Sequence, residues 1–345
     1  MLETDAVIIG AGPVGIYLAF QLGLLETQAH LIDALPHPGG QCVALYGDKP
    51  IYDIPGIPLC TGQSLVDGLL QQVKPFAPPM HLGHLVQSFQ RLDDGRLEVT
   101  TQRGLVLRAK AVFIAGGAGA FMPRSPAIEG LSALPPEDLQ YQLNENHART
   151  LEGKRHIVVL GDGDGALEAA IALGQGKHPQ TQVTLVHRRA VFAAAAHIQE
   201  ALEEAIAAKL VRFIAAQLSG MRTDGGRLHS LHGMDANGAS VDIDCDHLLV
   251  LQGLSPKLGP IAEWGLAMER RQLKVDTETY ATSEAGIYAV GDIISYPGKK
   301  KLIASGFSEA IIAGFASMSV IAPQRRVMLQ YTSSSTQLQR LLGVL

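Results

Sequence analysis

The chain is poor in cysteine and in positive charge, and these two shortages exclude several classes of protein. Its 345 residues include three cysteines, Cys42, Cys60 and Cys245, which are far apart and form no Cys-x-x-Cys pair. This pattern argues against a disulfide framework and a zinc site, and it fits a reducing cytoplasm. The formal net charge of −5 lacks the basic footprint that nucleic-acid binding usually requires. We therefore expect no metal site and no nucleic-acid partner.

Long uninterrupted hydrophobic runs are also missing. The most apolar stretch, residues 302–321, contains Glu309 and several glycine and serine residues, so we expect a buried or half-buried helix and no membrane association. The first residues, MLETDAVIIGAG, have no basic region and reach a strand at once, which predicts no signal peptide. These features favour a cytoplasmic protein. We also expect two domains, because single cores seldom grow beyond about 250–300 residues.

A buried strand followed by a glycine-rich turn opens the chain. The run DAVIIG leads into GAGPVGIYLAFQLG, where Gly10, Gly12 and Gly15 have the G-x-G-x-x-G spacing. In this motif the first glycine allows a tight turn, the second lets the backbone approach a pyrophosphate, and the third lets helix pack on strand. The next strand, AHLID, ends at Asp33, where an acid can bind a ribose hydroxyl. This order of elements predicts a dinucleotide site.

The same arrangement recurs in the middle of the chain. RHIVVLGDGDGALEAAIALG contains a strand, two glycines at Gly161 and Gly163, and a helix. The following strand, QVTLVHRR, ends in the basic residues Arg188 and Arg189 where the first copy has an acid. A carboxylate would repel a 2′-phosphate, whereas guanidinium groups bind it through charge-assisted hydrogen bonds. We therefore predict FAD at the first site and NADP at the second.

Two further segments belong to the same pattern. AKAVFIAGGAGAFMPR predicts a buried strand that runs into a glycine-rich crossover at residues 116–124. EAGIYAVGDI predicts another buried strand, with Gly291 and Asp292 at its carboxyl end. Ligands of open α/β sheets bind at that end of the strands.

These elements together resemble the two-dinucleotide-binding flavoproteins of the thioredoxin reductase type. The segments GGQCVALYGDKPIYDIPG, GAFMPR, LGPIAEWGL and YPGKKKLIASGFSEA are similar to those of a narrower family, the thioredoxin-reductase-like ferredoxin–NADP reductases. The resemblance implies an α/β fold of two Rossmann-like three-layer domains and a homodimer. It places an FAD-binding domain at residues 1–120 and 253–345, with a carboxyl-terminal extension over the flavin, and an NADP-binding domain at residues 121–252.

Cys42 occupies a position where related flavoproteins carry a redox-active cysteine. In the glutathione reductase type the partner cysteine follows five residues later, and here that residue is Gly47. In thioredoxin reductase a Cys-x-x-Cys precedes the second glycine motif, but residues 137–156 contain no cysteine. Because a dithiol relay needs two sulfurs within bonding reach, we predict that Cys42 only packs near the flavin. Electrons would then leave directly from the flavin.

The resemblance also implies residues around the flavin. Tyr46 should stack on one face of the isoalloxazine ring, and Tyr331, which replaces a family histidine, on the other. Asp292 should bond the ribityl chain. Further contacts with FAD are implied for Gln41, Val86, Phe121 and Ser333. We predict no catalytic acid or base, since the polypeptide places the cofactors and tunes their electrostatics.

By the same resemblance, NADPH is the co-substrate, one FAD is bound non-covalently per subunit, and the acceptor is ferredoxin or flavodoxin. Such acceptors are acidic, so we expect a basic docking patch of Lys299, Lys300, Lys301, Arg325 and Arg326. Ala193 replaces an arginine of the family's HRRDxFR pattern, which should weaken NADPH binding. Two alternatives stay open: an NADPH-dependent reductase of quinones or other small acceptors, and a flavin-based redox sensor.

Overall fold

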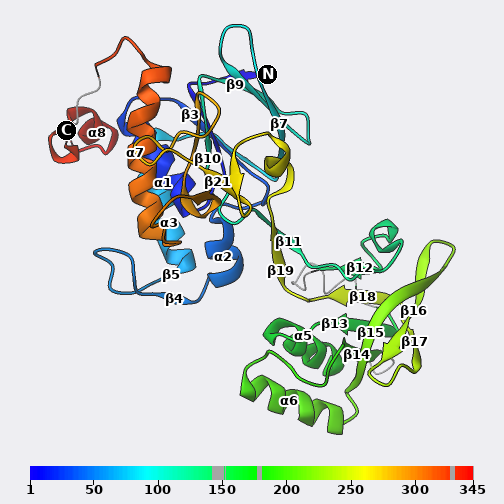
Figure 1. The fold of residues 1–345 in the computed structure, drawn as a ribbon. Coiled ribbons are helices and arrows are strands. Elements are labelled where there is room, and N and C mark those ends of the chain that lie inside the picture. Colours follow the sequence, from blue (N-terminus) through cyan, green and yellow to red (C-terminus); the bar gives the residue numbers. More distant parts are fainter. Residues whose placement is uncertain (142–150, 152, 177–180, 327–330, 345) are drawn as a thin grey trace. The chain divides into compact units, whose positions relative to one another are not determined.

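The computed structural model describes residues 1–141, 151, 153–176, 181–326 and 331–344, apart from the side chains of residues 46, 120–122 and 254–257 (Figure 1). It divides into two compact units, Met1–Phe121 with Pro256–Leu345 (unit 1) and Met122–Ser255 (unit 2). The domain boundaries expected from the sequence were residues 120 and 253. Two short strands, β11 (Ala120–Pro123) and β19 (Leu254–Lys257), pair where the chain passes between the units.

Unit 1 is built on a five-stranded parallel sheet of order β22-β10-β2-β3-β6. Every residue of β2 and β10 is buried, as expected for parallel strands that are covered on both faces. The strands are Ala6–Ile9 (β2), Ala29–Asp33 (β3), Met80–Leu82 (β6), Ala111–Ile114 (β10) and Ile287–Ala289 (β22).

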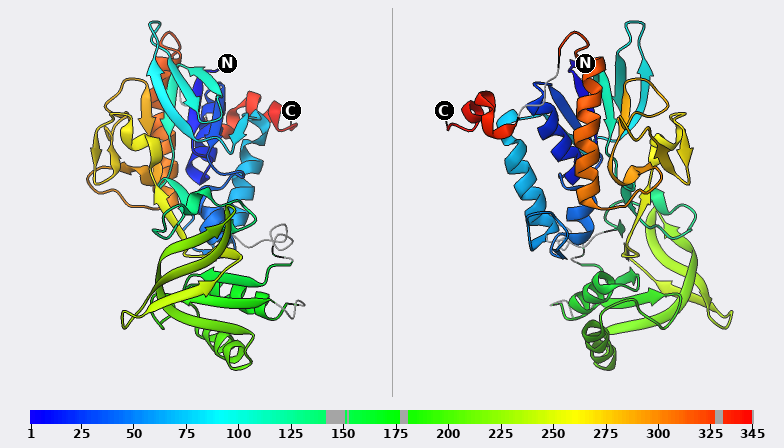
Figure 2. Two further views of the ribbon diagram at one scale, coloured as in Figure 1. Left: turned by 90° about the vertical axis from the view of Figure 1, so that its right-hand side faces the viewer. Right: turned by 60° about the vertical axis from the view of Figure 1, so that its left-hand side comes forward.

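Helices cover one face of this sheet and a second sheet covers the other (Figures 1 and 2). Helix α1 (Pro13–Leu24) packs between α3 (Gly62–Val73) and α7 (Ile303–Ile321). The second sheet has the order β1-β9-β8-β7, and its core side chains join the same hydrophobic cluster. Its strands are Leu2–Glu3 (β1), Val86–Arg91 (β7), Leu97–Thr101 (β8) and Val106–Ala109 (β9). Unit 1 thus has the predicted three layers.

Helix α7 is the apolar stretch that was expected to be buried or half-buried. By length and composition alone it could cross a membrane. It packs against α1, β10 and β22, and its buried residues include the charged Glu309. These contacts are those of a core helix.

Shorter elements complete unit 1. Helix α2 (Gly40–Tyr46) precedes a small hairpin, and helix α8 lies against the 3-10 turn η1. These elements are Pro50–Ile51 (β4), Cys60–Thr61 (β5), Lys74–Phe76 (η1), Gly259–Glu263 (η4), Met268–Glu269 (β20), Gln272–Lys274 (β21), Gly291–Ile293 (η5), Ile294–Ser295 (β23), Thr332–Ser334 (η6) and Thr336–Leu341 (α8).

Unit 2 is built on a seven-stranded sheet of order β12-β18-β13-β14-β15-β16-β17, parallel as far as β15 and antiparallel beyond it. Alternate residues of β13 enter separate cores: Val159 packs with helices α5 and α6, and Val158 with the opposite face. This confirms a second Rossmann-like domain. Its elements are Leu131–Ala133 (η2), Leu139–Gln140 (β12), His156–Leu160 (β13), Asp164–Gly174 (α5), Gln182–His187 (β14), Ala196–Ala207 (α6), Val211–Asp224 (β15), Arg227–Asp235 (β16), Ser240–Asp244 (β17) and His247–Val250 (β18).

Candidate functional site

The first glycine-rich turn joins β2 to α1, as its sequence predicts. Gly10 has a φ of +114°, and a Cβ at this position would lie 2.4 Å from the carbonyl oxygen of Ala115, so the turn accepts only glycine. A Cβ on Gly15 would lie 1.9 Å from the carbonyl oxygen of Gly10, which explains the close approach of helix and turn. By contrast, nothing lies within 4 Å of a Cβ built on Gly12. This leaves an open cradle beside the first turn of α1.

Asp33 ends β3 and is bonded to the same turn. Its Oδ2 accepts a hydrogen bond of 2.6 Å from the backbone N–H of Ala11, and its Oδ1 accepts one of 2.8 Å from the N–H of Leu35. Burial raises the pKa of Asp33 above its ordinary value, although the two backbone amides oppose the shift. An additional hydroxyl donor would therefore stabilise this carboxylate.

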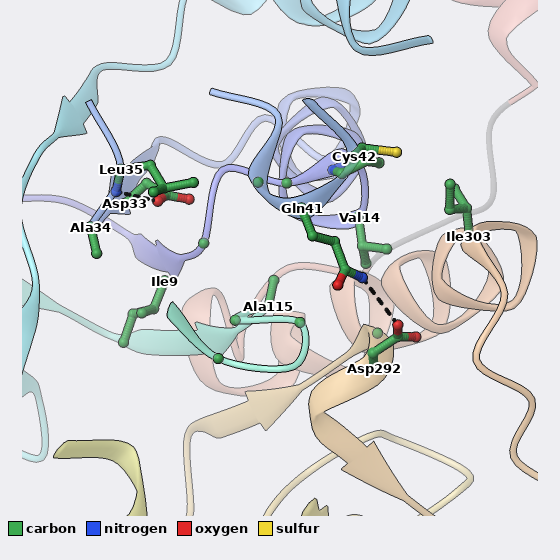
Figure 3. Close-up of a pocket in the computed structure, with 18 of the residues that line it drawn as sticks. Ile9, Val14, Asp33, Ala34, Leu35, Gln41, Cys42, Ala115, Asp292 and Ile303 are labelled. Carbon is green, nitrogen blue, oxygen red and sulfur yellow. Dashed lines mark hydrogen bonds between the residues drawn. The ribbon is translucent and has the colours of Figure 1, made fainter. Parts of the chain in front are cut away.

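A pocket of about 610 Å³ opens at these residues, within unit 1 (Figure 3). Its volume is in the range of small-molecule and cofactor sites. Ile303 at the amino-terminal end of α7 and Lys301 just before it also line the pocket. The structure brings six of the predicted site residues to its wall: Gly10, Gly12, Asp33, Gln41, Val86 and Asp292.

The paired glycines at the start of α2 direct this helix toward the glycine-rich turn. Gly39 and Gly40 both have positive φ, 109° and 53°, and the N–H of Gly39 donates a hydrogen bond of 2.8 Å to the carbonyl oxygen of Ala11. Gln41 then projects toward Asp292, and its Nε2 donates to Oδ2 at 3.4 Å (Figure 3). The α2 segment and the Gly-Asp segment thus meet at one pocket, although 251 residues separate these two side chains.

The turn that carries Asp292 lies at the carboxyl end of β22. Gln272 holds it in place, because Nε2 of this residue donates hydrogen bonds of 3.1 Å to the carbonyl oxygen of Asp292 and 2.9 Å to that of Ile294. The site therefore occupies the edge of the parallel sheet where ligands of such folds bind.

All three cysteines lie in the part of the chain that the structure describes, and each is a free thiol. Cys42 lines the pocket and is only 5% exposed. Burial, with a smaller contribution from the neighbouring Cys60, raises the pKa of Cys42 above its ordinary value. The neutral thiol is thereby favoured, and it is a poor nucleophile.

The second glycine-rich turn joins β13 to α5 in unit 2. A Cβ on Gly161 would lie 2.4 Å from the carbonyl oxygen of Leu251, whereas a Cβ on Gly163 would meet nothing within 4 Å. Gly163 is the residue that precedes α5, so the open space adjoins the amino-terminal end of this helix. The two predicted glycines thus repeat the close packing and the open cradle of the first turn.

A second pocket, of about 410 Å³, lies at the carboxyl ends of the parallel strands of unit 2. Arg188 lines it, as does His187, whose Nε2 lies 3.6 Å from Oδ2 of Asp162. Burial lowers the pKa of His187, and Arg188 and Arg189 add to this effect while Asp162 opposes it. Arg189 is exposed and does not belong to the pocket wall.

The structure adds residues to this pocket that the sequence analysis missed. Arg124 brings a second guanidinium group, and β15 and the segment after β18 supply polar side chains; the added residues are Arg124, Gln217, Ser219 and Gln252. Arg124 ends the GAFMPR segment, which the sequence indicated as part of a glycine-rich crossover but not as a binding site. Ala193 lies in the loop after β14 and is held by its N–H, which donates a hydrogen bond of 2.9 Å to the carbonyl oxygen of Asp162.

Comparisons with known proteins agree with this geometry. Residues 4–314 match the family model described as pyridine nucleotide-disulphide oxidoreductase. The chain is 47% identical to "Ferredoxin--NADP reductase" of Methylibium petroleiphilum over 99% of its own length and 93% of the relative's. It is also 47% identical to the protein of that name from Albidiferax ferrireducens, over 99% and 96% of the two chains.

The chain belongs to the thioredoxin-reductase-like ferredoxin–NADP reductases, within the pyridine nucleotide-disulphide oxidoreductase family.

Solved structures show the same fold at low sequence identity. Thioredoxin reductase of Lactococcus lactis aligns with a TM-score of 0.60 and 21% identity over 93% of this chain and 99% of that one. Bacillithiol disulfide reductase of Staphylococcus aureus aligns with a TM-score of 0.62 and 16% identity over 94% and 100% of the two chains. The expected fold class is therefore confirmed.

Of the predicted aromatic partners of the flavin, only Tyr331 has its side chain in the described part of this ferredoxin–NADP reductase family member. The side chains of Tyr46 and Phe121 lie outside the described part of the structure. Tyr331 is 73% exposed, Ser333 is exposed as well, and neither lines the pocket of its own chain. Their roles stay predictions.

The expected basic docking patch is wrong in one residue, Lys299. The side chain of Lys299 is 6% exposed and forms an ion pair with the buried Glu309, so it cannot contact a partner. Arg325 pairs with Glu26 at 2.6 Å. Lys300 and Lys301 are exposed. Of the three lysines, Lys299 therefore belongs to a buried ion pair, and only Lys300 and Lys301 remain at the surface.

Proposed function

We propose that the protein transfers electrons from NADPH, through one non-covalently bound FAD, to ferredoxin or flavodoxin. The observation that carries this proposal is the contrast between the two glycine-rich turns. One adjoins a half-buried carboxylate, Asp33, and the other adjoins a pocket lined by Arg188 and Arg124. The names of the relatives favour ferredoxin reduction over the quinone-reductase and sensor alternatives.

The residues of the first pocket fit FAD. Gly12 leaves a cradle open, and a Cβ on Gly40 would lie only 3.2 Å from the Cα of Gly12, so two glycine backbones meet where a pyrophosphate could pass. Asp33 would hold the ribose, and Gln41 and Asp292 would hold the ribityl end. When bound, FAD supplies the conversion of a two-electron hydride transfer into single-electron transfers.

The residues of the second pocket fit NADPH. Arg188 and Arg124 would bind the 2′-phosphate by charge-assisted hydrogen bonds, and the exposed Arg189, which does not line the pocket, would add to the local positive charge. The open side of Gly163 at the start of α5 would receive the pyrophosphate. With Ala193 in place of the family's arginine, the remaining guanidinium groups would still favour NADPH over NADH, but by a smaller margin.

The position of Tyr331 supports a homodimer. Helix α8 lies against η1 and contains the buried Leu338, whereas Tyr331, which precedes this helix, faces solvent. Because Tyr331 does not reach the pocket of its own chain, we propose that it covers the flavin of a second copy, opposite Tyr46. The supporting observation is that the side chain of Tyr331 is exposed while the helix that follows it, α8, lies against η1 and not at the pocket.

The acceptor would dock near the mouth of the first pocket. Lys301 lines the pocket and is exposed, and Lys300 beside it is also exposed. Ferredoxins and flavodoxins are acidic, so these lysines would speed the encounter by long-range attraction, which salt screens.

Steady-state assays test this function. Purified enzyme with NADPH should reduce ferredoxin or flavodoxin with a kcat/KM well above that for quinones, and the value should fall as ionic strength rises. Efficient turnover of quinones together with none of either protein acceptor would contradict the proposal.

A further inference from the structure

The ion pair of Lys299 and Glu309 is buried behind the first pocket and has no part in the function proposed above. The two side chains are 6% and 1% exposed, so both charges are removed from water. Such removal costs several kcal/mol per ion, and a buried ion pair often stabilises a fold no better than apolar side chains would. Stability alone therefore does not account for this pair.

Three donors converge on the Glu309 carboxylate. Its Oε2 accepts a hydrogen bond of 2.7 Å from the backbone N–H of Gly291, and its Oε1 accepts one of 2.8 Å from the hydroxyl of Tyr296. Nζ of Lys299 also donates to Oε1. Burial and the Glu309 charge raise the pKa of Tyr296, so this hydroxyl keeps its proton and remains a donor.

Gly291 connects this cluster with the pocket. Both Gly291 and Asp292 line the pocket wall, and the carboxylate of Glu309 binds the backbone N–H of the first of them. Gly291 has a φ of +82°, which is the conformation that starts the η5 turn. The buried charges are therefore separated from the pocket only by the backbone of Gly291, which is next to the residue that meets Gln41, Asp292.

We propose that Glu309 is a positioning residue that holds the Gly291–Ile293 turn, and that Lys299 cancels its charge so that the pair adds no net charge behind this pocket wall. A redox group that gains negative charge on reduction is easier to reduce beside an unpaired cation and harder beside an unpaired anion. The balance of this pair therefore helps to set the reduction potential of the flavin. This inference rests on the proposed function, which places FAD in this pocket.

Redox titration of bound FAD in two single variants tests the proposal. Glu309→Gln keeps an oxygen that can accept from Gly291 but removes the negative charge, so the potential should rise. Lys299→Met keeps most of the aliphatic stem but removes the positive charge, so the potential should fall. The double variant restores neutrality and should return toward the wild-type potential.

A matched control changes the same charge at a distance from the pocket. Glu98 pairs with Arg108 at 2.7 Å across β8 and β9, and neither residue lines the pocket. Glu98→Gln should leave the flavin potential unchanged. Shifts of the same sign in the two single variants, or shifts no larger than that of Glu98→Gln, would overturn the proposal.

Loss of FAD from a single variant also gives an answer. If Glu309→Gln or Lys299→Met folds without FAD, the double variant decides. If the double variant binds FAD and shows the wild-type potential, the proposed cancellation of charge is supported. If the double variant also loses FAD, the proposed cancellation is contradicted. Failure of the proposed function is distinct, because it would appear in the wild-type protein as no FAD bound or no reduction by NADPH.

Discussion

Asp33 and Ala11 are joined by a hydrogen bond of 2.6 Å from a backbone N–H to a half-buried carboxylate. The bond links the end of β3 to the first glycine-rich turn, so a single side chain both shapes the turn and faces the pocket. The same carboxylate therefore has a structural and a binding role, which variants can separate.

Asp33→Ala should weaken FAD binding more than Asp33→Asn. Alanine removes both the bond to Ala11 and the proposed acceptor for the ribose, whereas asparagine keeps one oxygen. A lost hydrogen bond to a charged group costs about 1.5–3 kcal/mol, so we expect a roughly 10- to 100-fold higher Kd for Asp33→Ala. Titration of the apoprotein with FAD measures this, and equal affinity of wild type and Asp33→Ala would contradict the assigned role.

Arg188→Ala and Arg124→Ala should each raise KM for NADPH and leave KM for NADH nearly unchanged. Each removes one guanidinium group from the second pocket. Loss of a charge-assisted contact of about 1.5–3 kcal/mol corresponds to a roughly 10- to 100-fold effect on binding.

Calorimetric titration with 2′,5′-ADP and with 5′-AMP separates recognition of the 2′-phosphate from that of the adenosine. Arg222, which is exposed and pairs with Asp242 at 3.1 Å on the β15–β17 hairpins, provides the control Arg222→Ala. An equal loss of affinity for both ligands would show that the arginines do not select the 2′-phosphate.

The histidine pair of β3 and β6 should make unit 1 sensitive to acid. His30 Nδ1 and His81 Nε2 lie 2.9 Å apart, a hydrogen bond that requires at least one neutral ring. Burial lowers the pKa of both residues below the ordinary 6.5, with neighbouring histidines adding to the effect. The unfolded chain therefore binds these protons more readily than the folded one, and stability should be complete above pH 6.5 and fall as the pH drops through the lowered pKa values.

Thermal unfolding followed between neutral and acidic pH tests this behaviour. The double variant His30→Gln with His81→Gln should show a smaller fall of Tm with pH than the wild type. His37 is exposed, so His37→Gln serves as a control and should keep the wild-type slope. An unchanged slope in the double variant would assign the acid sensitivity to other groups.

Local sequence patterns predicted the features that depend on short spacing. The glycines of both turns, the acid at Asp33 and the bases after β14 each follow a strand within one βαβ unit, where chain geometry leaves few alternatives. The fold class followed from the repetition of this unit. The pocket wall made by Gln41 and Asp292 could be expected only through resemblance, because the two residues meet across most of the chain.

The positions of three residues depend on tertiary contacts and could not be predicted from local sequence patterns. Three consecutive lysines indicate a charged surface, but Lys299 turns inward because Glu309, ten residues later, provides a buried partner. Arg124 was missed because it reaches the second pocket from the crossover strand, before the nucleotide motif begins. Tyr331 could be assigned to a flavin by resemblance, yet no local pattern states which copy of the pocket it would serve.

Anaerobic rapid mixing of the FAD-loaded enzyme with NADPH and then with oxidised ferredoxin tests the central claim, that electrons pass from NADPH to FAD to the acceptor without a thiol step. The wild type and Cys42→Ser should both lose the oxidised flavin band promptly and then reduce ferredoxin at equal rates, because Cys42 is a buried free thiol. A flavin band that NADPH does not bleach, or a Cys42→Ser protein that keeps its FAD but no longer reduces ferredoxin, would contradict the account.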